Sequence, residues 1–69
     1  MFTLINTTTR NAFYTITRRG TTVIVRWGRM GTRGQEKRFN FSTVASAMVF
    51  LEEKMEDKLV NRNYRMVHA

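Results

Sequence analysis

The hydrophobic period of the chain changes at Ser42, and this change constrains the fold more than any other feature. Before it, residues 35–41 (QEKRFNF) alternate as in a β-strand with one buried face, and Lys37, Phe39 and Phe41 share one side. After it, apolar residues recur at helical spacing. Either Ser42 or Thr43 can cap the free backbone N–H groups of the first helical turn. The predicted apolar stripe consists of Val44, Ala47, Met48, Leu51, Met55 and Leu59.

Two further strand-like segments precede this one. Residues 11–17 (NAFYTIT) and 22–27 (TVIVRW) are rich in aromatic and β-branched residues, which favour strands. Between them, Arg18-Arg19-Gly20-Thr21 is typical of a hairpin turn in which the glycine takes a positive φ. The two segments should therefore form a β-hairpin, with residues 35–41 as its third strand.

The ends of the chain add two short extended segments. Residues 2–5 are predicted to form a short edge strand. The helix is predicted to end at residues 61–63 (NRN), after which residues 64–67 return as an extended segment. An antiparallel sheet that carries one helix is the simplest two-layer solution for such a set of elements. The sequence thus predicts a single α+β domain over residues 1–69, with a small sheet of about four strands packed against one α-helix.

The composition excludes several kinds of site. The 69 residues include no cysteine and one histidine, His68, so no disulfide, zinc site or catalytic thiol is expected, and no metal or cofactor. No apolar run approaches the ~20 residues that span a bilayer. The N-terminal MFTLINTTTR is too short and too polar for a secretory signal. The expectation is a cytoplasmic protein that does not bind membranes.

Positive charge is concentrated in one half of the chain. The formal net charge is +7, and residues 10–38 hold eight cationic side chains against a single acid, Glu36. Residues 42–60 instead hold four acids against Lys54 and Lys58. A segregated basic surface of this kind attracts polyanions, and nucleic acid is the first candidate. The alternative is a solvated surface that serves only solubility.

An enzyme is not expected. No histidine inside the domain could activate Ser42 or a threonine, and no pair of carboxylates is placed for acid–base work. The glycines at 28, 31 and 34 form neither a phosphate-binding loop with Gly-Lys-Ser/Thr nor a GxGxxG pattern.

The segment VRWGRMGTRGQ, residues 25–35, carries the best evidence for binding. Glycines allow close backbone approach to a ligand, and consecutive N–H groups can form an anion-binding concavity. The guanidinium groups of Arg29 and Arg33 suit phosphate, and Trp27 offers a flat face for a sugar or an unpaired base. The competing interpretation is that Trp27 belongs to the core, because period-two counting puts it on the side of Val23 and Val25.

The same segment resembles the signature of the WGR domain, which occurs in DNA-dependent poly(ADP-ribose) polymerases and in short bacterial proteins. The likeness extends from Trp27-Gly28-Arg29 through Gln35, and residues 11–14 (NAFY) resemble the family's Asn-x-Phe-Tyr strand. Tyr64 lies close to the position of the aromatic residue that follows the helix in this family. The interval between the helix and Tyr64 is one residue longer than in the polymerases. The helix pattern that completes the likeness is Ala47, Leu51, Lys54, Met55 and Lys58.

This resemblance implies an antiparallel sheet with one helix and binding to DNA strand breaks. It implies that Trp27 packs on a terminal sugar or base and that Arg29 contacts phosphate or a partner. Lys54 and Lys58 would either contact the DNA backbone or pair with Glu53 and Asp57. These 69 residues do not include a catalytic transferase domain. The predicted nucleic-acid-binding residues are Asn11, Arg26, Trp27, Arg29, Arg33, Gln35, Lys37, Lys54 and Lys58, with the loop glycines Gly28, Gly31 and Gly34.

The resulting hypothesis is a module that binds DNA by structure, at ends, nicks or single-stranded junctions. One alternative is a protein-interaction module that uses the same tryptophan and arginine, which are common anchors of protein interfaces. Another is RNA binding, with DNA favoured as the partner. Membrane association ranks last, because the helix is acidic. The short bacterial members suggest a location in the bacterial cytoplasm, including association with the nucleoid.

Overall fold

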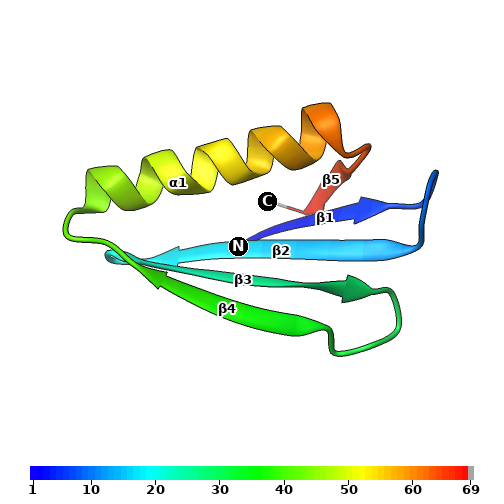
Figure 1. Ribbon diagram of the computed structural model, residues 1–69, viewed down its shortest axis with the longest axis horizontal. Helices are drawn as coiled ribbons and strands as arrows, with labels where there is room; N and C mark the ends of the chain where they lie inside the picture. Colours follow the sequence, from blue (N-terminus) through cyan, green and yellow to red (C-terminus); the bar gives the residue numbers. More distant parts are fainter. Residues whose placement is uncertain (69) are drawn as a thin grey trace.

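The computed structural model describes residues 1–68 and contains one five-stranded antiparallel sheet and one helix (Figure 1). The strands are arranged in the order β4-β3-β2-β1-β5, and the helix runs along one side of the sheet. In chain order the elements are β1 (Phe2–Asn6), β2 (Ala12–Arg19), β3 (Thr22–Arg29), β4 (Gln35–Asn40), α1 (Val44–Glu56), the π-helical turn η1 (Asp57–Asn61) and β5 (Arg65–His68).

The predicted α+β architecture is confirmed, with one strand more than expected. The segment after the helix pairs with β1 as the edge strand β5. The prediction that residues 2–5 form an edge strand is therefore wrong, because β1 lies between β2 and β5. Sequence patterns miss this because a four-residue strand with every residue exposed has no hydrophobic alternation.

The central hairpin follows the predicted pattern. β2 and β3 pair along their full lengths and are joined by Gly20 and Thr21, with Gly20 at a φ of 61°. The register places Tyr14 opposite Trp27 and Ile16 opposite Val25. β3 continues through Gly28 and Arg29, so the loop to β4 is shorter than the predicted residues 28–34. This extension fixes the WGR tripeptide on a strand rather than on a flexible loop.

The helix begins where the sequence indicates. Thr43 is the N-cap, and its side-chain oxygen accepts a hydrogen bond of 3.1 Å from the N–H of Ser46. This bond satisfies one of the backbone donors left free in the first turn. The chain turns at Asn63, which has a φ of 61°, before β5 begins. Within residues 1–68, no helix has the length and apolar character to cross a membrane.

The core lies between the helix and the sheet, and the apolar stripe is rotated from the prediction. Ala47 is fully buried and Leu51 and Met55 pack against the core as predicted, but Val44, Met48 and Leu59 are exposed. Phe50, which the stripe omitted, faces the sheet instead, with its ring 4.7 Å from that of Phe39. Phe50 also stacks on Phe41, so burying one large aromatic ring outweighs burying flexible methionines.

The helix covers only one face of the sheet. Side chains of a strand alternate between faces, so residues neighbouring in sequence point to opposite sides. Leu4, Tyr14, Ile16, Val23 and Val25 are buried beneath the helix. On the other face, no element among the described residues forms a second layer. The sheet therefore has one face in the core and one face in solvent.

Candidate nucleic-acid interface

Trp27 lies at the edge of the core, on the helix-facing side of β3. It is half-buried and packs against the buried core cluster. Its neighbours across the sheet are Tyr14 on β2 and Gln35 on β4. The core and contact interpretations of Trp27 are thus compatible, because part of the indole is buried and part remains accessible.

Two open hollows meet at Trp27. The larger has a volume of about 720 Å³ and lies toward the β1–β2 loop. The smaller, about 190 Å³, lies between β4 and the helix. Trp27 lines both, so we call the pair together the Trp27 cleft. Its polar and aromatic lining comprises Arg10, Asn11, Arg29 and Tyr64 in the larger hollow, and Tyr14, Lys37, Phe39, Lys54, Asp57 and Lys58 in the smaller.

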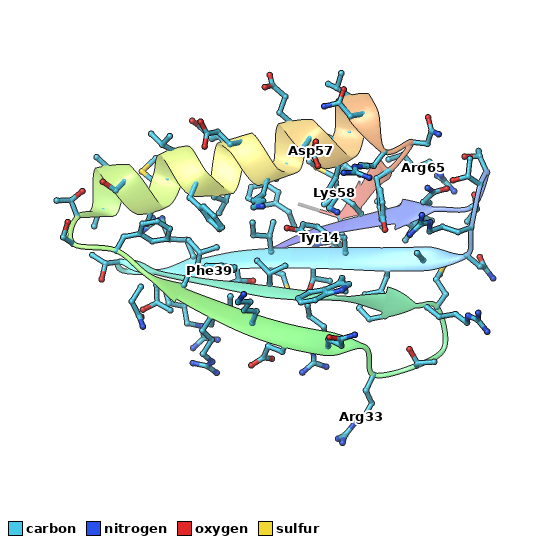
Figure 2. The ribbon with its side chains drawn as sticks, in the orientation of Figure 1. Tyr14, Arg33, Phe39, Asp57, Lys58 and Arg65 are labelled. Carbon is cyan, nitrogen blue, oxygen red and sulfur yellow. The ribbon has the colours of Figure 1, made fainter. Side chains whose placement is uncertain are left out.

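Aromatic rings position the lysines of the cleft. The Lys58 ammonium lies 4.7 Å from the centre of the Tyr14 ring and 5.6 Å from that of Tyr64. Lys54 lies over Phe50 at 5.4 Å, and an ammonium over a ring face is attracted to its electron density. Figure 2 shows Lys58 between the helix and the sheet, directed toward Tyr14. Both lysines line the smaller hollow, Lys58 against rings of the sheet side and Lys54 against a ring of its own helix.

The pKa values in the cleft reflect its partial burial. Burial is the main cause that lowers the pKa of Lys58, with a smaller opposing effect from Asp57. Burial also raises the pKa of Tyr14 to about 12, helped by the negative charge of Asp57. Low local polarity weakens the hydration of a charge, so burial shifts both pKa values toward the neutral forms.

The acid in the cleft is bound by its own neighbours on the helix. Asp57 accepts a hydrogen bond of 3.2 Å from the Asn61 amide and lies 3.6 Å from the Arg62 guanidinium. The Asn61 hydrogen bond is the main cause that lowers the pKa of Asp57. Over residues 1–68, no salt bridge involves Lys54 or Lys58. Of the two predicted alternatives, pairing of these lysines with Glu53 and Asp57 is thus not observed.

The loop glycines are required by the backbone. A Cβ added to Gly28 would lie 2.6 Å from the Cα of Gly34, and one added to Gly34 would collide with the Trp27 carbonyl oxygen. The ring of Phe13 lies against both glycines on the solvent face of the sheet. Gly31 has a φ of 89° with open space around it. Because Gly28 and Gly34 have no side chains, their backbones can approach each other closely beside Trp27.

Comparison with known proteins identifies the family of this chain. The family model of the WGR domain matches residues 1–68. The chain belongs to the WGR domain family. A crystal structure of a protein from Bacteroides fragilis superposes with a TM-score of 0.88 at 28% sequence identity, covering 96% of this chain. The chain spans 19% of the length of that protein. No curated protein matches the chain. WGR domains are generally nucleic-acid-binding modules.

The structure brings most of the predicted WGR residues together. Asn11 and Arg29 lie with Trp27 in the larger hollow, and Lys37, Lys54 and Lys58 lie with it in the smaller one. Gln35 is the cross-strand neighbour of Trp27. Their roles in binding remain predictions, but their clustering is a property of the fold.

Two predicted residues lie elsewhere. Arg33 projects from the tip of the β3–β4 loop, away from the helix (Figure 2). Arg26 precedes Trp27 on β3, so its side chain lies on the opposite face of the sheet and pairs with Glu36 at 3.1 Å. The sequence grouped them with Trp27 by proximity along the chain, but strand alternation separates Arg26 from it.

The prediction omitted several residues that shape the cleft, among them Arg10, Tyr14 and Asn6. Arg10 and Tyr14 line it, and Asn6 holds the loop that presents Arg10. Asn6 is 2% exposed, and its side-chain oxygen accepts hydrogen bonds from the N–H groups of Thr8 and Thr9. Its amide nitrogen donates to the Arg62 carbonyl, which ties this loop to the end of the helix. An asparagine followed by three threonines is a recognisable turn signal.

The helix ends in the π-helical turn η1 before the chain reaches Tyr64. A π turn closes hydrogen bonds over five residues, one more than an α turn. The ring of Tyr64 packs edge-on against Tyr14, with centroids 6.2 Å apart, and lines the larger hollow. The N–H of Tyr64 donates to the Lys58 carbonyl at 3.1 Å. Tyr64 therefore forms part of the lining of the cleft.

Proposed function

We propose that this WGR domain binds DNA, with the Trp27 cleft as the centre of contact. One observation carries the proposal: a partly accessible tryptophan lies where two hollows meet, and cations line both. Guanidinium and ammonium groups attract and hold phosphate, while an indole face stacks on a sugar or base. The cations are Arg10, Arg29, Lys37, Lys54 and Lys58.

We further propose that this binding is selective for DNA structure rather than sequence. Phosphate contacts supply affinity but carry no sequence information. The bases of a continuous duplex are already stacked on each other, so their faces are closed to Trp27. An end, a nick or a single-stranded junction exposes such a face. Stacking on an aromatic is worth ~1–3 kcal/mol per base, enough to favour these structures over intact duplex.

Fluorescence anisotropy tests this proposal. The labelled probes are a 5′-phosphorylated duplex end, a nicked duplex, a single strand and a matched RNA, each at two salt concentrations. Closed circular plasmid serves as the competitor without ends. We expect ends and nicks to resist this competitor, and affinity to fall steeply with salt through release of counterions.

Substitutions identify the site within the same assay. Trp27→Ala should weaken end binding about tenfold or more, while Trp27→Phe, which keeps a ring, should weaken it less. Thermal melting checks that each variant is folded. The proposal fails if Trp27→Ala combined with Arg29→Ala leaves DNA affinity unchanged in a folded protein. Tighter binding to the matched RNA would replace DNA as the partner, and no binding at low salt would favour a protein partner.

A further inference from the structure

The solvent face of the sheet carries its own group of cations. Arg19, Arg26 and Arg38 lie there on three successive strands, β2, β3 and β4. They line a shallow hollow of about 460 Å³. We call this surface the open face; the rest of its lining is Met1, Thr15, Thr17, Ile24 and Glu36. None of these residues lines the Trp27 cleft.

The strand register arranges these side chains as a grid. One row runs from Thr15 through Arg26 to Glu36, and the next from Thr17 through Ile24 to Arg38. Neighbouring strands are about 4.8 Å apart, so Arg26 has Thr15 beside it on one strand and Glu36 beside it on the other. Guanidinium and threonine hydroxyl groups are among the side chains that contact phosphate and sugar in nucleic-acid complexes.

Glu36 binds two of the arginines and leaves most of their N–H donors free. Its two carboxylate oxygens accept one hydrogen bond each, from Arg26 Nη2 at 3.1 Å and from Arg38 Nε at 3.4 Å. A guanidinium has five N–H donors, so most of them stay free. The Arg26 and Arg38 side chains are 49% and 64% exposed, respectively. The pair is thus held in position while its remaining donors face solvent.

Among the described residues, no aromatic side chain lines the hollow of the open face. Phe13 is on the same face, but its ring lies against the backbone of Gly28 and Gly34. Contact through arginines and threonines alone engages the phosphate backbone and does not distinguish an end from a continuous duplex. The chemistry of the open face therefore differs from that of the Trp27 cleft.

We propose that the open face is a second nucleic-acid-binding surface that grips the phosphate backbone of a continuous duplex. Because the sheet separates it from the Trp27 cleft, one domain holds two nucleic-acid segments on opposite sides. This inference extends the proposed function but does not depend on Trp27. Three arginines against one glutamate give the charge complementarity to a polyanion. The competing occupant is the acidic outer side of the helix of a second copy, which carries Glu52, Glu53 and Glu56.

Adjacent residues on the strands supply a matched pair of variants. The test variant is Arg19→Gln with Arg38→Gln, which removes two charges from the open face. The control is Arg18→Gln with Lys37→Gln, which removes the same charge from the immediately preceding residues. Lys37 lines the Trp27 cleft, and Arg18 lines a groove between the sheet and the helix. Net charge is therefore equal in the two variants, and only the face differs.

Binding to closed circular duplex, which offers no ends, is measured against salt. The test variant should reduce the slope of log affinity against log salt by about 1.8, since each lost phosphate contact removes about 0.9. The same variant should keep the quenching of Trp27 by duplex ends. The control should weaken end binding and reduce the slope for circular duplex by less than the test variant does. Equal slopes for the test variant and the original protein would overturn the proposal.

Sedimentation with an excess of a short duplex gives the second measurement. The original protein should carry two duplexes per chain, and the test variant one. If the original protein is instead a dimer carrying one duplex per chain, and Arg19→Gln with Arg38→Gln dissociates it, the open face is an interface between copies and the proposal is wrong. Trp27→Ala serves to separate the two sites: it should abolish end preference while two-duplex binding at low salt persists.

Discussion

The Lys58 ammonium lies 4.7 Å from the centre of the Tyr14 ring, on the side of the cleft that Trp27 lines. This contact joins the end of the helix to the centre of the sheet. It also places a partly buried positive charge beside the aromatic surface on which a base or sugar would stack. The cleft thus combines a positive charge suited to phosphate with an aromatic surface suited to a base or sugar.

Replacing Lys58 separates binding from stability. In Lys58→Met a flexible apolar side chain can stay against the two tyrosine rings, so stability should change by less than about 1 kcal/mol. DNA binding should weaken, and its salt slope should fall by about 1, because one phosphate contact is lost. Lys58→Arg, which keeps the charge, is the control. Urea unfolding and salt-dependent anisotropy make the two measurements. An unchanged salt slope would remove Lys58 from the site.

Tyr14 should make the domain lose stability in alkali. Its pKa is raised from 10.0 to about 12 in the folded protein, mainly by burial. Between these values the unfolded chain releases the phenolic proton while the folded chain keeps it, so stability falls as pH rises. At ~1.4 kcal/mol per pKa unit, the loss across this window is at most about 3 kcal/mol, because solvent screens part of the effect. Urea unfolding from pH 9 to about 12 should show this loss, and Tyr14→Phe should remove it. A similar loss in the variant would contradict the account.

Asn6 should contribute more to stability than an exposed asparagine. Removing its side chain in Asn6→Ala leaves the Thr8 and Thr9 N–H groups and the Arg62 carbonyl without their partner. The expected cost is about 2 kcal/mol, with weaker DNA binding because the loop that carries Arg10 loosens. Asn40, whose side chain bonds Thr22 at the surface, is the control, and Asn40→Ala should cost less than about 0.5 kcal/mol. Equal effects of the two substitutions would refute this role.

The loop glycines should differ sharply in their tolerance of alanine. Gly31 has positive φ and open space, so Gly31→Ala should cost about 1–2 kcal/mol from backbone strain alone. Gly34 also has positive φ, and its added Cβ would collide with the Trp27 carbonyl. Gly34→Ala should therefore cost more than about 3 kcal/mol or prevent the hairpin from closing. Chemical denaturation compares the two. If Gly34→Ala proves as mild as Gly31→Ala, the close packing beside Trp27 is not essential.

The sequence could predict the elements that carry a strong period. The β2–β3 hairpin, the turn at Gly20 and the cap at Thr43 follow from local chemistry, and the structure has all three. The pairing of β5 depends instead on contacts with β1, which are more than fifty residues away in the chain. The local sequence of a short exposed strand does not indicate which distant strand it pairs with.

The candidate site was also predictable only in part, because some of it depends on packing between segments that are distant in the chain. Trp27, Arg29 and Gln35 are recognisable from the motif, but the rotation of the helix decides which lysines join them. That rotation is set by Phe50, which packs between Phe39 and Phe41. It directs Lys54 and Lys58 toward the sheet. Side chains alternate along a strand and Arg26 directly precedes Trp27. The sequence could therefore also have predicted that Arg26 lies on the other face of the sheet.

The most direct test of the account is the emission of Trp27, the only tryptophan in the chain, during titration with DNA. Nicked and closed circular forms of one plasmid are compared at equal nucleotide concentration, with binding followed in parallel by sedimentation. The account predicts that nicked DNA shifts or quenches the emission in proportion to nicks, while closed DNA binds with little change. Binding of both forms with no change in Trp27 emission would contradict the central role of the cleft.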